Sequence, residues 1–299
     1  MHHLVRAADV RPAPEYSQHG VGMTRASLVD RSVGSVHTAF GLCALAEGGS
    51  LDTHVHSFEE LFYILEGSPI LILDGHAVEL KPGACGVVPV GMSHAWRGPG
   101  KGSASWIDMR TPIPRQQSEP PDTFFLGKAP QSPAQALDIR DPRNRHLFVM
   151  SEDDIDVKKL QVGSRVNAPT VSASMATALL AYSGIAVKML VDQRLDAALA
   201  TMFMVDYQLG GVAHPHDHPL EEAYYMIEGE VEVTADGATY TLRPGDAFWT
   251  GVGTIHAFVS RTSSRVRWLE TQSPQPPARH SYRFDRDWDY LTKKLKDQS

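Results

Sequence analysis

An internal repeat constrains this chain more than any other feature of its sequence. When the sequence is compared with itself at a shift of 162 positions, without a gap, three histidines and one glutamate meet identical residues. Glycine-containing turn signals also meet at this shift, so that Glu-Gly, Asp-Gly and Pro-Gly pairs recur in the same order. Self-similarity at a fixed spacing is the signature of a duplicated structural unit. The 299 residues are also a natural length for two domains of ordinary size.

The turn signals within each copy predict an antiparallel β structure. Asp74-Gly75 and Asp236-Gly237 each separate two short stretches of strand-like residues, which is a strong hairpin signal. Each following strand ends at a Pro-Gly pair, another turn dipeptide. Many short strands joined by glycine-rich turns indicate a jelly-roll barrel, whose closure removes exposed strand edges. We therefore expect an all-β protein built from two tandem jelly-roll β-barrels.

The segments outside the repeats suggest the domain boundaries. We predict an N-terminal barrel over 1–115, a linker and wrapping segment over 116–170, a C-terminal barrel over 171–280 and a helical tail over 281–299. The segment between the copies is rich in proline and charged residues, which is typical of a linker. In the tail, Trp288, Leu291 and Leu295 lie at helical spacing, so we expect a short C-terminal helix that packs on a barrel.

Composition excludes several classes of partner. The formal charge is −7 and no cluster of Lys and Arg resembles a phosphate-binding face, so we expect no nucleic-acid partner. No apolar run approaches the roughly 20 residues that span a bilayer, and the first residues hold no apolar signal segment. We therefore expect a cytoplasmic protein with no membrane partner. The sequence leaves open whether the protein forms a homo-oligomer. Cys43 and Cys85 are too few for a thiolate cage, so nitrogen and oxygen must hold any metal.

Repeated histidines and glutamates predict a metal site in each copy. His54 and His56 lie two positions apart, which places both side chains on one face of a strand. Glu60 keeps to this face if the intervening residues stay extended or make a small bulge. His94 arrives from a later segment, on a strand that barrel closure can bring alongside. The second copy repeats the same spacing with His216, His218, Glu222 and His256.

These motifs resemble those of the cupin superfamily, in which an HxH pair is followed by a glutamate and a glycine, and a PxG or GxG segment by a further histidine. The resemblance covers both copies and implies a two-barrel cupin, or bicupin, with one divalent transition metal in each barrel. The implied ligand sets are His54, His56, Glu60 and His94 in one barrel, and His216, His218, Glu222 and His256 in the other. Such sites suit Mn, Fe(II), Ni, Cu or Zn, and the sequence does not choose among them. Four protein ligands leave two octahedral positions open, which favours catalysis over a purely structural metal.

Strand alternation predicts the side chains around each metal. The expected inward neighbours are Phe62, Ile64 and Trp96 in the first barrel, and Tyr224, Met226 and Phe258 in the second. Mostly apolar walls with one phenol fit a small organic or aromatic substrate, although Ile64 and Met226 fit an ordinary core role equally well. Tyr224 can donate a hydrogen bond or a proton to a substrate, so Tyr224 and Glu222 are the candidate catalytic residues.

Three further residues near the motifs are given secondary roles. His214 forms a second HxH pair with His216, and we expect it at the mouth of the second barrel. Glu59 and Glu221 directly precede the two ligand glutamates and have the opposite strand parity. We therefore expect both to be surface acids.

Three functions fit this reading, and we favour a metal-dependent dioxygenase that acts on a small aromatic or dicarbonyl/carboxylate compound. The alternative is a non-redox Mn- or Zn-dependent bicupin, such as a decarboxylase, an isomerase or a ureidoglycine aminohydrolase-like enzyme. Oxalate decarboxylases place an arginine three residues before the first ligand histidine, where this chain has Leu51 and Ala213. The aminohydrolase family has lost the metal set of its N-terminal barrel. A non-catalytic small-molecule-binding cupin ranks third, because such members have typically lost the ligands.

Overall fold

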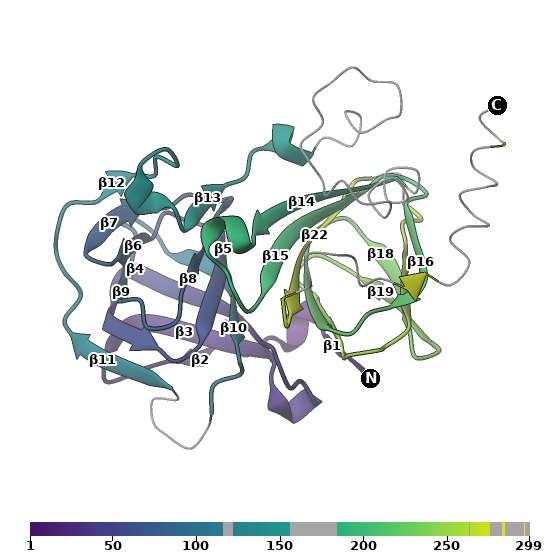
Figure 1. Ribbon diagram of the computed structural model, residues 1–299, viewed down its shortest axis with the longest axis horizontal. Helices are drawn as coiled ribbons and strands as arrows, with labels where there is room; N and C mark the ends of the chain where they lie inside the picture. The colour runs from purple at the N-terminus through teal and green to yellow at the C-terminus, as the bar shows by residue number, and fades with distance from the viewer. Residues whose placement is uncertain (116–121, 156–183, 263, 276–282, 285–295, 297–299) are drawn as a thin grey trace. The chain divides into compact units, whose positions relative to one another are not determined.

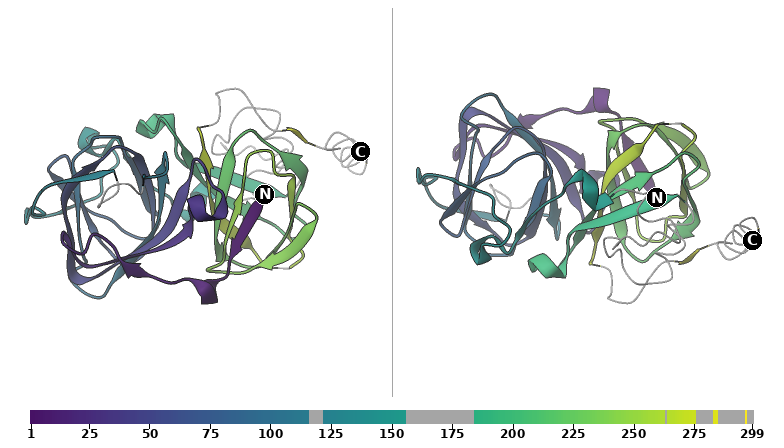
Figure 2. Two further views of the ribbon diagram at one scale, coloured as in Figure 1. Left: turned by 90° about the horizontal axis from the view of Figure 1, so that it is seen from below. Right: turned by 90° about the horizontal axis from the view of Figure 1, so that it is seen from above.

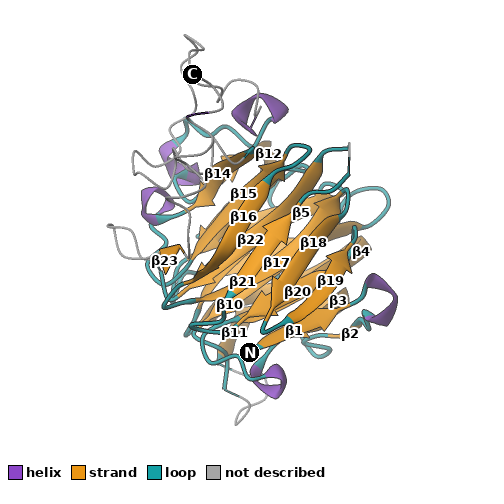
Figure 3. Ribbon diagram, turned by 90° about the vertical axis from the view of Figure 1, so that its right-hand side faces the viewer, coloured by secondary structure: helices purple, strands orange, loops and turns teal. Residues whose placement is uncertain are grey.

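The computed structural model describes residues 1–115, 122–155, 184–262, 264–275, 283–284 and 296. These residues form mostly β-strands, as Figure 3 shows, which confirms the predicted all-β class. Within the described residues up to 284, the short helical elements are single 3-10 turns: η1 (Ala7–Asp9), η2 (Arg31–Val33), η3 (Pro142–Asn144), η4 (Glu152–Ile155) and η6 (Gln193–Leu195). Strand pairing therefore determines the architecture.

The chain forms two compact units, and each includes a segment that is distant in sequence. One unit, the first barrel, consists of Asp9–Met150 and Leu190–Thr201. The other unit, the second barrel, consists of Met1–Ala8, Ser151–Met189 and Met202–Ser299. The domain boundaries expected from the sequence stay predictions.

The strands of the first barrel form one curled sheet, whose purple to teal strands are labelled in Figure 1. The order is β12-β7-β6-β9-β4-β10-β5-β8-β13, with β3 and β11 also pairing with β4, and β2 pairing with β3. The bounds are β2 (Ala13–Pro14), β3 (Gly20–Val29), β4 (Ala39–His56), β5 (Glu59–Glu66), β6 (Ile70–Leu73), β7 (His76–Glu79), β8 (Ala84–Val88), β9 (His94–Arg97), β10 (Ala104–Thr111), β11 (Thr123–Gly127), β12 (Gln135–Ala136) and β13 (Leu147–Val149).

The second barrel consists of two sheets, in the orders β1-β20-β17-β22-β15-β14 and β19-β18-β21-β16-β23. Two further views of each barrel are given in Figure 2. The bounds are β1 (His2–Val5), β14 (Ile185–Val191), β15 (Thr201–Tyr207), β16 (Val212–Asp217), β17 (Glu221–Glu228), β18 (Val231–Ala235), β19 (Ala238–Leu242), β20 (Ala247–Thr250), β21 (His256–Val259), β22 (Val266–Ser273) and β23 (Arg283–Phe284). The stretch of chain that forms the single strand β4 in the first barrel thus forms two strands, β15 and β16, in the second.

The predicted Asp-Gly hairpins are present in both barrels. Asp74 and Gly75 join β6 to β7 with φ angles of 47° and 79°, and Asp236 and Gly237 join β18 to β19 with φ angles of 49° and 80°. Two successive residues with positive φ make the tight turn that matches the twist of a hairpin, and Asp and Gly tolerate that conformation. The turn residues therefore set the register of each hairpin.

Each barrel has its own apolar core. The first core includes Leu45, Phe62, Trp96 and Trp106, and the second includes Val205, Tyr224, Phe258 and Trp268. These side chains alternate with outward residues along the strands, so that one face of each strand is buried. The metal-ligand candidates project from the same inward faces.

Two expectations concern the ends of the barrels and membrane contact. The predicted helical tail over 281–299 lies outside the described residues, except for Arg283–Phe284, which forms β23, and Lys296. Over the described parts of the chain, no helix has the length and apolar character needed to cross a membrane.

Candidate metal centres

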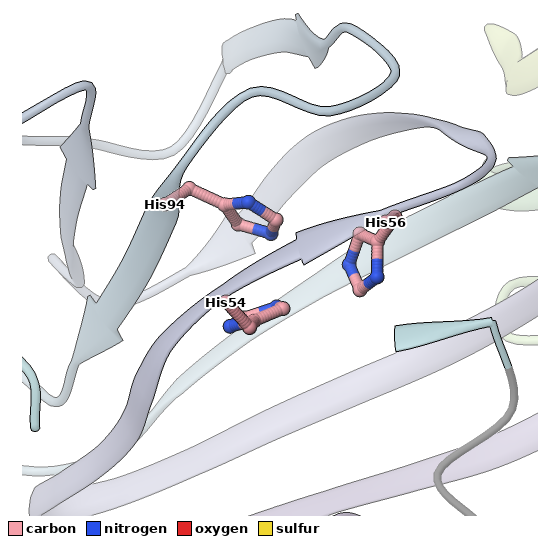
Figure 4. A group of neighbouring side chains, drawn as sticks. All are labelled: His54, His56 and His94. Carbon is pink, nitrogen blue, oxygen red and sulfur yellow. The ribbon is translucent and has the colours of Figure 1, made fainter. Parts of the chain in front are cut away.

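The first barrel brings His54, His56 and His94 together from two neighbouring strands. His54 on β4 lies directly opposite His94 on β9, and the register shifts between Leu51 and His54, just before the ligand pair. The imidazole centroids of His54 lie 4.0 Å from His94 and 4.7 Å from His56, and Figure 4 shows the three rings together. All three are buried. One nitrogen of each ring lies within 4.8 Å of one from each of the others.

The second barrel repeats this arrangement with His216, His218 and His256. His216 on β16 lies directly opposite His256 on β21, and the register again shifts just before His216. The ring of His256 lies 4.3 Å from that of His216 and 5.1 Å from that of His218. This triad is also buried, with nitrogens within 4.8 Å of one another. The same bulge and pairing therefore build both triads.

Hydrogen bonds fix which ring nitrogen each histidine presents. In five of the six histidines, Nδ1 lies 2.6 to 3.1 Å from a backbone carbonyl oxygen. A carbonyl oxygen can only accept, so Nδ1 donates and the lone pair of a neutral ring is left on Nε2. In the sixth, Nδ1 of His56 lies 2.9 Å from Oγ1 of Thr123. Such partners on the outer nitrogen are characteristic of metal-binding histidines.

The two glutamates complete the donor sets. Oε2 of Glu60 lies 3.0 Å from Nε2 of His56, and Oε2 of Glu222 lies 2.7 Å from Nε2 of His218. A carboxylate oxygen and the lone pair of a neutral imidazole repel each other unless a cation lies between them. Three imidazole nitrogens and one carboxylate oxygen therefore fit a divalent metal ion in each barrel, and the donor set suits several transition metals.

The electrostatics of His54 and Glu222 favour the ligand forms. Burial, together with the nearby His94 and His56, holds the pKa of His54 well below its usual range. Burial alone would raise the pKa of Glu222, but the neighbouring His218 and His256 outweigh it and hold that pKa well below its usual value. Neutral imidazoles and an ionised carboxylate are the protonation states that bind metal.

The second centre has polar neighbours that the first lacks. The phenol of Tyr224 donates a hydrogen bond to Oε2 of Glu222, and its oxygen lies 3.2 Å from Nε2 of His256. Nε2 of Gln272 donates to Oε1 of the same carboxylate at 2.6 Å. Glu270 is buried nearby, and burial and the charge of Glu222 raise its pKa well above the usual value. Sequence reasoning missed Gln272 and Glu270, although both have the same strand parity as the core residues Val266 and Trp268 on β22.

The first barrel has different residues at the equivalent positions of the repeat. Phe62 corresponds to Tyr224, Arg110 to Gln272 and Asp108 to Glu270. Arg110 donates to both carboxylate oxygens of Glu15, at 2.8 and 2.9 Å, and its Nε lies 2.7 Å from Asp108. Asp108 also accepts two bonds of 2.9 Å from Arg25. A buried network of charges therefore replaces the phenol and amide that reach the second centre.

Segments outside the repeats add further residues to the first centre. β11 pairs with the ligand strand β4, which places Thr123 beside His56 and Phe125 beside His54. The ring of Tyr16 lies 6.1 Å from that of His54 and 5.5 Å from that of Phe125. No sequence signal pointed to Thr123, Phe125 or Tyr16, because none of them belongs to the repeated motif.

The structure buries all six residues predicted as inward neighbours of the centres: Phe62, Ile64, Trp96, Tyr224, Met226 and Phe258. Trp96 stacks on Trp106 at 4.6 Å, and the ring of Phe258 lies 5.1 Å from that of Tyr224 and 5.9 Å from that of His256. His214 is partly buried, and its backbone carbonyl accepts the bond from Nδ1 of His216. His214 thus supports the second centre through its main chain.

The expectation that Glu59 and Glu221 are surface acids is wrong, since both are buried. Both Glu59 carboxylate oxygens accept hydrogen bonds from the consecutive backbone N–H groups of Ala198, Leu199 and Ala200, at 2.7 to 3.3 Å. Strand parity predicts which face a side chain occupies, but not that a segment from more than a hundred residues away covers that face.

Comparisons with known proteins agree with this architecture. The Cupin domain family model matches residues 41–110 and 203–271. The chain is 32% identical over 113 residues to the tetracenomycin polyketide synthase protein TcmJ of Streptomyces glaucescens, which is 37% of this chain and 74% of that protein.

Two solved structures share the fold over nearly the whole chain. Oxalate decarboxylase of Lactobacillus farciminis superposes with a TM-score of 0.63 at 16% identity, covering 98% of this chain and 92% of that one. Salicylate 1,2-dioxygenase of Pseudoaminobacter salicylatoxidans superposes with a TM-score of 0.64 at 13% identity, covering 91% and 81%. With two matched cupin domains, each containing a buried histidine triad, the chain belongs to the cupin superfamily and is a bicupin.

Proposed function

We propose that the protein is a metal-dependent bicupin enzyme, and that it is a dioxygenase acting on a small aromatic or dicarbonyl/carboxylate compound. The observation that carries the proposal is the second centre, where three imidazoles, a carboxylate and a phenol converge in a buried site. Four ligands leave coordination positions for substrate and dioxygen. The metal, when bound, would supply Lewis-acid or redox chemistry, and the protein residues would orient the substrate.

The surroundings of the second centre favour an aromatic substrate. The buried rings of Tyr224 and Phe258 lie beside His256, with Phe248 next to Tyr224, and such aromatic walls hold flat apolar molecules. The structural neighbour salicylate 1,2-dioxygenase was solved with gentisate, an aromatic acid, and a curated relative is a polyketide synthase protein. These likenesses support an aromatic substrate here.

We assign the chemistry to the second barrel, with Glu222 as a ligand and Tyr224 as the polar group that meets the substrate. Tyr224 is held by Glu222, two residues earlier on the same face of β17, so its oxygen has a fixed position. The first barrel has Phe62 at the equivalent position, which offers no proton and no hydrogen bond. The first metal then serves structure or regulation.

The alternative is non-redox metal catalysis, and it is favoured by one observation. Oxalate decarboxylase superposes on 98% of this chain. Leu51 and Ala213 stand where that family has an arginine before the ligands, so oxalate itself does not fit the sequence. A decarboxylase or isomerase for another acid stays the second candidate, and a binding protein without activity the third.

Elemental analysis of protein purified without added metal tests the proposal, alongside the variants Glu222→Gln and Glu60→Gln. Iron near two equivalents per chain, with oxygen consumption on catechols, hydroxybenzoates or diketones, would support the dioxygenase. Manganese or zinc without oxygen consumption would favour the non-redox alternative, and no metal in either barrel would leave only the binding protein. Glu222→Gln should abolish activity while Glu60→Gln retains most of it; equal losses would contradict the assignment to the second barrel.

A further inference from the structure

We propose that the first metal centre opens to solvent beside β11, and that the stacked rings of Phe125 and His19 form a gate over this opening. The gate limits how fast metal ions and other small molecules pass between solvent and the histidines. Both rings come from segments outside the repeated motif, one from β11 and one from the turn before β3. The inference rests on the proposed function only in requiring that the first barrel binds a metal.

The strand register places Phe125 on the inward face of the barrel. Phe125 lies directly opposite His54 in the antiparallel pairing of β11 with β4, and side chains at opposite positions share one face of a sheet. The ring of Phe125 lies 5.2 Å from that of His54. The preceding residue on β11, Phe124, has the opposite strand parity and is 59% exposed. Phe125 is therefore a direct neighbour of a metal-ligand candidate.

The exposure of the surrounding side chains locates the opening. The three histidines of the centre are between 1% and 3% exposed, whereas Phe125 and Tyr16, whose rings lie beside His54, are only partly buried. His19 stacks on Phe125 with a distance of 3.8 Å between ring centroids and an angle of 10° between ring planes, and its side chain is 38% exposed. On this side of the barrel, the ring of Phe125 and then that of His19 thus lie between His54 and solvent.

The backbone around Tyr16 holds the outer ring of the gate in place. The N–H groups of His19 and Gly20 both donate to the carbonyl oxygen of Tyr16 at 2.7 Å, and the N–H of Asp52 donates to the carbonyl oxygen of His19 at 2.8 Å. Tyr16 has a φ angle of 54°, a conformation that bulky side chains rarely adopt. Such strain persists only where the surrounding structure enforces it, and it is concentrated at ligand and switch sites. With the main chain anchored, the gate can open by rotation of the two side chains, without movement of a strand.

A gate affects the rates of exchange and leaves the equilibrium unchanged. Removing a ring that lies between the metal position and solvent lowers the barrier to entry and to exit alike, because the donor atoms of the centre stay the same. A residue that supports a ligand acts differently, since its loss lowers the affinity for the metal. The two rate constants together therefore distinguish a gate from a structural support.

The exchange kinetics of Co(II) test the gate. The metal-free His216→Ala/His256→Ala protein, in which the first barrel keeps its donor set, is mixed with Co(II), and visible absorption follows both the uptake of the ion and its release to excess EDTA. Phe125→Ala in this background should raise both rate constants by about tenfold or more, the change that corresponds to the loss of one aromatic pair, and should keep Kd within about twofold. His19→Ala, at a partly exposed position, should also raise both rates, and its rates decide the test if Phe125→Ala does not fold.

The neighbouring residue of the same strand provides a matched control. Phe124→Ala makes the same substitution at an exposed position and should leave both rate constants unchanged. Unchanged rates in Phe125→Ala and His19→Ala, or faster release without faster uptake, would overturn the gate and leave the proposed function standing. A first barrel that binds no Co(II) would overturn the gate together with the metal site assigned to that barrel.

Discussion

Nε2 of Gln272 donates a hydrogen bond of 2.6 Å to Oε1 of Glu222, whereas Arg110, at the equivalent position of the first repeat, donates to Glu15. The amide holds the glutamate so that its other oxygen faces the histidines of the second centre. The equivalent strands β10 and β22 thus differ at this position. In the second barrel Gln272 orients a metal ligand, whereas in the first barrel Arg110 belongs to a buried ion pair.

Replacing Gln272 by Leu should weaken metal binding in the second barrel. Without the amide, the carboxylate of Glu222 can rotate away from the histidines, and loss of such a supporting bond typically costs 10- to 100-fold in metal affinity. Competition with a chelator, in the His54→Ala/His94→Ala background that leaves one centre, measures the effect. An affinity equal to that of the background protein would show that Gln272 does not orient Glu222.

Replacing Arg110 by Met should destabilise the first barrel. Arg110 is buried between Glu15 and Asp108, and its loss leaves buried carboxylates without their partner. Breaking a buried ion pair on one side costs about 3 to 5 kcal/mol. Urea unfolding measures the loss, with Arg115→Met as the control, because Arg115 pairs with Asp122 but is largely exposed. If both substitutions lowered the free energy of unfolding by the same small amount, burial would not be what makes the Arg110 ion pairs important for stability.

The fold and both histidine triads could be predicted because their signals are local and occur twice. Strand alternation places His54 and His56 on one face, and the repeat confirms the spacing with His216 and His218. Alternation could also have identified Gln272, which lies two residues from Glu270 on the inward face of β22. These predictions need the geometry of a single strand, and for His94 and His256 also the closure of a barrel.

The remaining contacts depend on how distant segments fold back on the barrels. Thr123 reaches His56 only because β11 pairs with β4, and its sequence has no feature that specifies this pairing. Glu59 is buried only because Ala198 and its neighbours cover it. Local alternation cannot encode such coverage, since it depends on the path of the whole chain.

Replacing Thr123 by Val should weaken metal binding in the first barrel. Its hydroxyl is the partner of Nδ1 of His56, and without it the ring can turn and present the wrong nitrogen. We expect a loss of about tenfold or more in affinity. Chelator competition in a His216→Ala/His256→Ala background measures it, and Thr123→Ser, which keeps the hydroxyl, should restore binding. If Ser and Val variants bind equally, the hydroxyl has no such role.

Replacing Glu59 by Ala should destabilise the first barrel. Three consecutive backbone N–H groups, from Ala198 to Ala200, would lose their acceptor, and of these Ala200 is buried. Leaving a buried donor unsatisfied costs about 1 to 3 kcal/mol, so the loss at Ala200 alone should be about 2 kcal/mol. Glu59→Gln keeps one oxygen and should lose less. Thermal unfolding measures both variants, and an Ala variant as stable as the parent protein would argue that these bonds contribute nothing.

Acid should destabilise the metal-free protein. Burial, with the neighbouring His94, lowers the pKa of His56 to about 4 against the raising effect of Glu60, and burial, with His256, lowers the pKa of His216 to about 3. An imidazole in the unfolded chain has a pKa of about 6.5, so between these values the unfolded state binds more protons. Stability is therefore full above about pH 6.5 and is lost as the pH falls.

The size of this acid effect follows from the same linkage. At pH 5 each of the two histidines should have removed about 2 kcal/mol from the free energy of unfolding. His218, whose pKa the carboxylate of Glu222 raises in spite of burial, acts in the opposite direction and offsets part of the loss. Urea unfolding with a chelator at pH 7.5 and pH 5 should show lower stability at pH 5, and the His56→Gln/His216→Gln variant should show a smaller difference. Equal stability of the parent protein at both values would mean that its imidazoles are already charged in the folded state, and charged imidazoles could not bind a metal until they released their protons.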